Sequence, residues 1–91
     1  MIEYLFNAII ASADEDAVIS AVVKDNFGDH VTSGAVLMLY SDSSLLETFK
    51  GKFDGEVWNF TIPASRYKGR YFYSIGVNNE SLCFKQAIYF K

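Results

Sequence analysis

AVISAVVKDNFGDHVTSGAVLMLY, residues 17–40, is the stretch that decides the fold. In its first eight residues, every second position is apolar: Ala17, Ile19, Ala21 and Val23. Because successive side chains of a strand point to opposite faces, these four would share one apolar face. A polar segment follows in which Asn26, Gly28 and Asp29 suit a tight connection. Residues 35–40 are apolar at every position, as expected for a strand in the middle of a sheet. The stretch therefore predicts two β-strands joined by a loop.

The rest of the chain continues the pattern of short strands separated by turns. Asp54-Gly55 is a hairpin dipeptide, and Pro63 ends a strand in which Trp58, Phe60 and Ile62 share one face. Residues 45–50 form a short strand, with a helix as the alternative there. Turns recur every 8 to 12 residues, which is typical of an antiparallel sandwich. The predicted strands, about seven, cover residues 4–13, 17–24, 35–40, 45–50, 57–62, 70–77 and 82–90.

The central stretch resembles bacterial Ig-like domains of the invasin/intimin type. In that family a strand ends in Val-x-Asp, a glycine turn follows, and Ser-Gly-x-Val opens the next strand. Lys68-Gly69-Arg70-Tyr71 is similar to the Gly-x-Tyr that begins a late strand of these domains. The resemblance implies that residues 1–91 form a single, all-β, Ig-like antiparallel β-sandwich. The central pattern is carried here by Val23, Asp25, Gly28, Val31, Ser33, Gly34 and Val36.

Length and charge restrict the classes of protein that fit. Ninety-one residues are enough for one domain that folds without disulfides or bound metals. The formal net charge of −3 argues against a general nucleic-acid or anionic-membrane binder, which needs a basic face. Cys83 is the single cysteine, so an intrachain disulfide is impossible and the domain can mature in a reducing compartment.

No group of residues predicts catalysis, a cofactor or a metal. His30, the single histidine, stands in a polar turn without an orienting partner, so we expect a solvated loop residue. Cys83 lies in a predicted strand and fits a packing thiol better than a nucleophile. Three adjacent acids, residues 14–16, lack the spacing of a calcium loop and predict a solvated turn. The sequence therefore favours a protein without enzymatic activity.

One aromatic cluster lies among cations and allows two interpretations. It can be a platform that stacks a sugar, a base or a protein. Alternatively it belongs to the core, with Tyr71 as a corner tyrosine whose hydroxyl bonds back to the backbone. The cluster comprises Tyr67, Tyr71, Phe72 and Tyr73, with Arg66, Lys68 and Arg70 beside them.

Apolar residues occupy both faces of some predicted strands. Leu37 and Leu39 oppose Val36, Met38 and Tyr40, although a small sandwich needs only one inward face per sheet. The surplus predicts that an outer sheet face packs on a protein partner, either another copy of the chain or a component of a larger assembly. The residues predicted to bind this partner are Tyr67, Tyr71, Tyr73, Leu37 and Leu39.

Two hypotheses for the function follow. The first is a structural or interaction module of a bacteriophage virion, such as a capsid decoration, head-completion or tail protein, assembled in the host cytoplasm. It rests on analogy of fold and on an N-terminal segment without the features of a signal peptide. The alternative is a carbohydrate- or surface-binding module of an adhesin on the bacterial cell, using Tyr67, Tyr71 and Trp58. Neither requires a small-molecule ligand.

Overall fold

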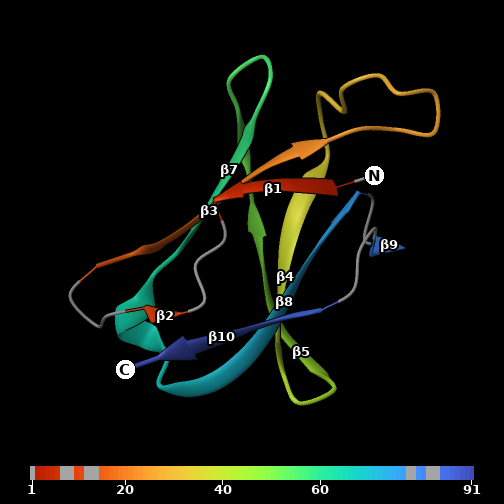
Figure 1. The fold of residues 1–91 in the computed structure, drawn as a ribbon. Helices are drawn as coiled ribbons and strands as arrows, with labels where there is room; N and C mark the ends of the chain where they lie inside the picture. Colours follow the sequence, from red (N-terminus) through yellow and green to blue (C-terminus); the bar gives the residue numbers. More distant parts are fainter. Residues whose placement is uncertain (1, 7–9, 12–14, 78–79, 82–84) are drawn as a thin grey trace.

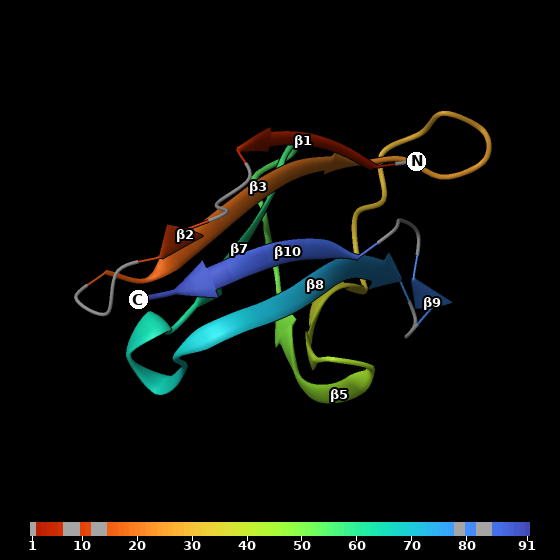
Figure 2. The ribbon, with the colours of Figure 1, turned by 60° about the horizontal axis from the view of Figure 1, so that its bottom comes forward.

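The computed structural model describes residues 2–6, 10–11, 15–77, 80–81 and 85–91, and the side chains of 15–77 and 85–91. It contains two packed β-sheets (Figures 1 and 2). The smaller sheet has the order β1-β3-β7-β6, and the larger sheet has the order β2-β10-β8-β4-β5, with β9 paired to β8. Pairing is antiparallel except between β2 and β10, which run parallel.

The described strands confirm the predicted all-β fold. Seven of the ten described strands are five residues or longer, and the other three are two-residue pairs. Among the described residues the only helix is the three-residue 3-10 turn η1 (Ala64–Arg66), and nothing helical there could cross a bilayer. The strands are β1 (Ile2–Phe6), β2 (Ile10–Ala11), β3 (Ala17–Val23), β4 (Ala35–Ser41), β5 (Ser44–Lys50), β6 (Lys52–Phe53), β7 (Trp58–Ile62), β8 (Gly69–Val77), β9 (Glu80–Ser81) and β10 (Gln86–Phe90).

The core lies between the sheets and is built by alternation. In β7 the side chains of Trp58, Phe60 and Ile62 are buried, whereas Asn59 and Thr61 point away from the core, as predicted. The Trp58 indole Nε1–H donates to the Val31 carbonyl oxygen at 2.7 Å, which satisfies its polar group. Each fully buried side chain of this size contributes about 1.5–3 kcal/mol. The core residues are Ala17, Ile19, Ala21, Val23, Ala35, Leu37, Leu39, Trp58, Phe60, Ile62, Ala64, Tyr73, Ile75, Ile88 and Phe90.

Gly51 marks the point where the chain leaves the larger sheet for the smaller one, between β5 and β6. A Cβ atom at this position would lie 2.6 Å from the Phe60 ring and 2.7 Å from the Trp58 ring. Such distances are far inside van der Waals contact, so the crossing requires glycine because the core rings occupy the space that a side chain would need.

Two boundaries differ from the sequence-based expectation. The predicted first strand, 4–13, is divided, because β1 pairs with β3 in the smaller sheet whereas β2 pairs with β10 in the larger one. Residues 78–81, which separate the last two predicted strands, include β9, and β9 pairs antiparallel with the end of β8. The predicted strand positions Leu82, Cys83 and Phe84 lie outside the described residues, as does Asp14.

Candidate docking surface

The free edge of the larger sheet carries exposed leucines. Strand β5 ends the strand order and pairs with β4 alone among the described strands, so its other side is unpaired. The register slips between the pairs Leu39↔Glu47 and Tyr40↔Leu45, which leaves Leu46 as the extra residue of a β-bulge. Leu45 is 52% exposed and Leu46 is 48% exposed. A bulge bends the strand and re-aims side chains, so it is the local reason that both leucines meet solvent.

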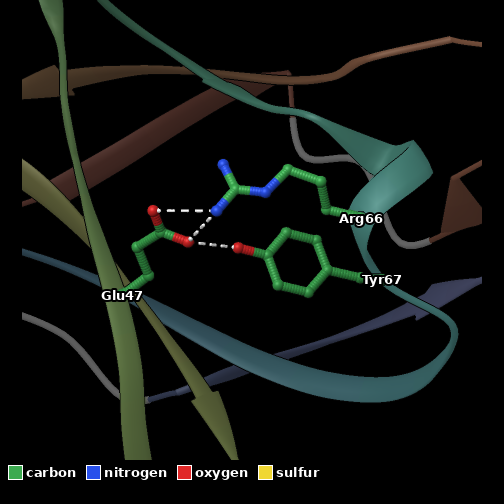
Figure 3. A network of polar contacts seen from close by, with 3 residues as sticks. All are labelled: Glu47, Arg66 and Tyr67. Atoms are coloured by element: carbon green, nitrogen blue, oxygen red, sulfur yellow. Dashed lines mark hydrogen bonds and ion pairs between the residues drawn. The ribbon is translucent and has the colours of Figure 1, made fainter.

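A polar network fixes β5 to the connection between the two sheets (Figure 3). The Tyr67 hydroxyl donates to Glu47 Oε2 at 2.5 Å. The Arg66 Nη2 group donates to both Glu47 oxygens, at 3.3 Å to Oε1 and 3.1 Å to Oε2. Glu47 belongs to β5, whereas Arg66 ends η1 and Tyr67 follows it. The network therefore holds the edge strand in place at its middle, directly beside the exposed leucines.

The same contacts shift the acidities of the two partners. The hydrogen bond from Tyr67 is the main cause that lowers the pKa of Glu47, and Arg66 acts in the same direction. Burial, and then the bond to the Glu47 carboxylate, raise the pKa of Tyr67 to about 12. At neutral pH the Glu47 carboxylate is therefore held by the neutral phenol of Tyr67 and the guanidinium of Arg66.

Three of the predicted partner-binding residues lie inside the sandwich. Leu37, Leu39 and Tyr73 are each 0% exposed and belong to the core between the sheets. The outward positions of β4 are instead Val36, Met38 and Tyr40, the set opposite to the one chosen from the sequence; Val36 and Tyr40 are half-buried and Met38 is buried. A side chain with no exposed surface can contact a partner only after the sheets separate, so these three are not carried into the proposal below.

The other two predicted residues are half-buried and pack on the core edge. The Tyr67 and Tyr71 rings meet edge to face with centroids 5.5 Å apart, and each lies 5.5 Å from the Phe90 ring. The Tyr67 hydroxyl bonds to a side chain, Glu47, rather than to the backbone. Within the described part of the chain no acceptor for the Tyr71 hydroxyl is present, so the expected corner bond is not seen there. Packing explains most of this aromatic cluster.

The outer face of the larger sheet is partly covered by its own cations. The Lys85 ammonium lies 3.9 Å from the centroid of the Tyr40 ring, and the Arg70 guanidinium lies 5.2 Å from that of Phe72. Both aromatic residues are half-buried as a result. Cations over aromatic faces are attractive, and their aliphatic stems shield apolar surface. The apolar surplus of this face is therefore smaller than the sequence suggests.

The remaining candidates for chemistry behave as simple surface or core residues. His30 is exposed, and its ring centroid lies 6.5 Å from that of Phe53. Glu15 and Asp16 are exposed. No cluster of metal-ligating side chains occurs in the described ranges. Trp58, a member of the proposed sugar platform, is only 4% exposed and donates its N–H internally, so it offers no stacking face.

Sequence reasoning missed the β5 edge as a surface. The residues of the predicted strand 45–50 are correct, but the bulge depends on the register with β4, which no local pattern reveals. The sequence did carry one signal, since two adjacent leucines break strict alternation at that point. Phe27 was also missed, although it stands between turn residues, where a large apolar side chain is unusual.

Comparison with known proteins supports the fold alone. No family model matches this sequence, and no curated protein matches it either. Among solved structures it is similar to the filamin domain of Lin-41, with a TM-score of 0.68 over 99% of this chain and 91% of that chain, at 20% sequence identity. This protein is therefore an Ig-like β-sandwich, the fold class expected from the sequence.

Proposed function

We propose that this chain is a non-enzymatic interaction module that docks a partner protein against the free edge of β5. The observation that carries the proposal is the pair Leu45 and Leu46, about half exposed beside an unpaired strand edge. An unpaired edge presents backbone N–H and C=O groups that an extended segment of another protein can pair with. The two leucines supply apolar anchors next to those groups.

The network around Glu47 favours docking because it removes a cost of binding. A strand that is already held by Arg66 and Tyr67 loses little conformational freedom when a partner covers it. Strand β5 therefore offers backbone pairing, apolar contact and preorganisation at one place. By contrast, Arg66 and Tyr67 are engaged internally and serve as positioning residues.

We propose further that the partner belongs to a bacteriophage particle, and that the domain is a capsid decoration, head-completion or tail protein located in the virion. Support comes from the resemblance of residues 17–40 to bacterial Ig-like domains and from the Ig-like fold itself. This is an analogy of fold rather than a deduction from a site. Another copy of the chain or a different virion protein would be the molecule that contacts β5.

A particle-incorporation experiment tests both parts. The chain, tagged at one terminus, is expressed during phage infection, and particles are purified on a density gradient and probed for the tag. The wild-type chain should co-sediment with particles, whereas the double variant Leu45→Asp, Leu46→Asp should be absent from them. The control is Val18→Asp, at a position 37% exposed on the outer face of the smaller sheet, which should be retained.

The outcomes separate the two parts of the proposal. A wild-type chain that never enters particles overturns the virion assignment, and recovery with the bacterial envelope would favour the cell-surface alternative. Particles that incorporate the Leu45→Asp, Leu46→Asp variant as well as the wild type overturn docking through β5. Thermal unfolding of each purified variant shows whether a loss reflects docking or misfolding.

A further inference from the structure

The loop between β3 and β4 carries a solvent-exposed phenylalanine, Phe27. Phe27 is 89% exposed, at the tip of residues 25–30. The tip is rigid, because the Asp25 carboxylate accepts hydrogen bonds from the backbone N–H groups of Phe27 at 2.9 Å and Asp29 at 3.0 Å. The Asp25 N–H donates to the Asp29 carbonyl at 2.9 Å, and Gly28 takes the left-handed conformation with φ +84°. A preorganised, exposed aromatic ring is well suited to insert into a partner.

This tip, residues 25–30, lies at an acidic end of the molecule. The contact between the His30 and Phe53 rings places the β6–β7 turn beside it. Residues 24–30 and 52–56 together contain four carboxylates against two lysines. Asp29, two residues after Phe27, is exposed, and so are both acids of the β6–β7 turn. The Phe27 ring is thus surrounded by net negative charge.

A hollow lies along β10 and the start of β8, and Arg70 is the one cationic residue among the described residues of its lining. It has a volume of about 400 Å³ and is open to solvent. Tyr89 is 52% exposed and pairs directly with Arg70 across β10 and β8. Lys91 and Lys68 flank the same ends of these strands and are exposed. We call this feature the Arg70 hollow, lined by Arg70, Gln86, Ala87, Ile88 and Tyr89.

The two features face away from each other along the molecule. In Figures 1 and 2 the β3–β4 loop lies at one end, while the start of β8 and the end of β10 lie at the opposite end. A tip with exposed acids and an apolar ring is complementary to a hollow that contains Arg70 and Tyr89 and is flanked by Lys68 and Lys91, and such complementarity guides and orients association. Because the two surfaces differ, contact between copies is heterologous and continues from copy to copy.

We propose that the Phe27 tip of one molecule docks into the Arg70 hollow of a second copy of this chain, so that copies assemble head to tail. The Phe27 ring packs against Tyr89 and the guanidinium of Arg70, and Asp29 lies near the cations that flank the hollow. This inference goes beyond the function proposed above, since it uses the Phe27 tip and the Arg70 hollow and does not involve the β5 edge.

Sedimentation velocity of the purified full chain over a wide concentration range tests the assembly. The wild type should form species larger than a dimer as concentration rises, and added salt should reverse this. Phe27→Ser and Arg70→Glu should each weaken association about tenfold or more, as expected for an anchor residue and its pocket. Val18→Ser, at an exposed position on the outer face of the smaller sheet and outside both proposed docking surfaces, is the matched control and should assemble like the wild type.

Charge exchange makes the test specific for a head-to-tail contact. Asp29→Lys should block assembly, and the double variant Asp29→Lys, Arg70→Glu should restore it, because each contact then pairs the exchanged charges. A mixture of the Asp29→Lys chain and the Arg70→Glu chain should also assemble, in alternation, because the two changed surfaces are complementary to each other and so are the two unchanged ones, whereas either single variant alone should not assemble. Circular dichroism checks that every variant is folded.

Three results would overturn the inference. These are a monomer at every concentration, a dimer that never grows, or assembly that Leu45→Ser abolishes and Phe27→Ser leaves intact. The last result would assign self-association to β5. None of them bears on whether the chain enters particles, so failure here is separate from failure of the proposed function.

Discussion

Both faces of the larger sheet carry apolar residues, but different groups cover them: the opposite sheet covers the inner face, and cationic side chains cover part of the outer face. On the inner face Leu37, Leu39 and Tyr73 have no exposed surface at all. On the outer face Tyr40 lies beneath Lys85, which directly precedes β10, and Phe72 lies beneath Arg70 of β8, so each ring is shielded by a cationic side chain of the same molecule. The difference teaches that an apolar outer face need not await a partner, because long cationic side chains can cover it.

The largest effect should separate the two faces of β4. Leu37→Ala removes a fully buried side chain and should lower the free energy of unfolding by about 2–5 kcal/mol, because a cavity remains in the core. Val36→Ala, on the half-buried outer face, should cost about 1 kcal/mol or less. Urea denaturation measures both. Equal costs would mean that the two faces are wrongly assigned.

The crossing between the sheets should be the next most sensitive position. Gly51→Ala forces a methyl group against the Phe60 and Trp58 rings and should destabilise the fold by about 1–3 kcal/mol. Thr48→Ala, three residues earlier on the exposed side of β5, should stay within about 0.5 kcal/mol of the wild type. Thermal unfolding of the two variants side by side makes this comparison, and a neutral Gly51→Ala would contradict the close packing.

The cationic cover of the outer face should contribute less. A double-mutant cycle with Lys85→Ala and Tyr40→Leu should give a coupling energy of about 0.5–1 kcal/mol, the range of an exposed cation–π pair. Chemical denaturation of the four proteins supplies the cycle. A coupling near zero would leave the outer rings without this shield and would revive the idea that a partner covers them.

The last comparison is a pH dependence at the β5 edge, which is small near neutral pH and grows only at the extremes of pH. The pKa of Tyr67 is raised from 10.0 to about 12, so its contribution to stability is complete below pH 10 and is lost as pH rises towards 12. The lowered pKa of Glu47 has the opposite sense: its contribution is present above the ordinary carboxyl pKa and is lost as pH falls through the lowered value. Tyr67→Phe should reduce the alkaline loss, as seen in melting temperature against pH, with Phe72→Leu as a control that keeps it.

The sequence predicts the fold well and the docking surface poorly, for physical reasons. Period-two patterning is local, so β7 and most strand positions follow directly from it. The inward face of β4 cannot be predicted in this way, because both sets of alternate residues in AVLMLY are apolar. Packing against the opposite sheet decides which set faces the core. The cations carry a further signal, since Arg70 and Lys85 stand at positions that face outward.

The candidate site depends on long-range register rather than on local pattern. Glu47 meets Arg66 and Tyr67 only because β5 folds back beside η1, some 20 residues later in the chain. The bulge at Leu46 likewise depends on how β5 pairs with β4, which is distant information that the local sequence does not contain. The exposure of Leu45 and Leu46 could therefore be found in the structure but not in the sequence.

Residue-by-residue amide hydrogen exchange of the dilute monomer tests the free edge of β5 most directly. Amides of β4 pair on both sides and should be protected with nearly the full free energy of unfolding, whereas alternate amides of β5 should exchange many times faster because no described strand pairs with them. Uniform protection of Ser44–Lys50, equal to that of β4, would show an edge already occupied within the molecule and would contradict the account.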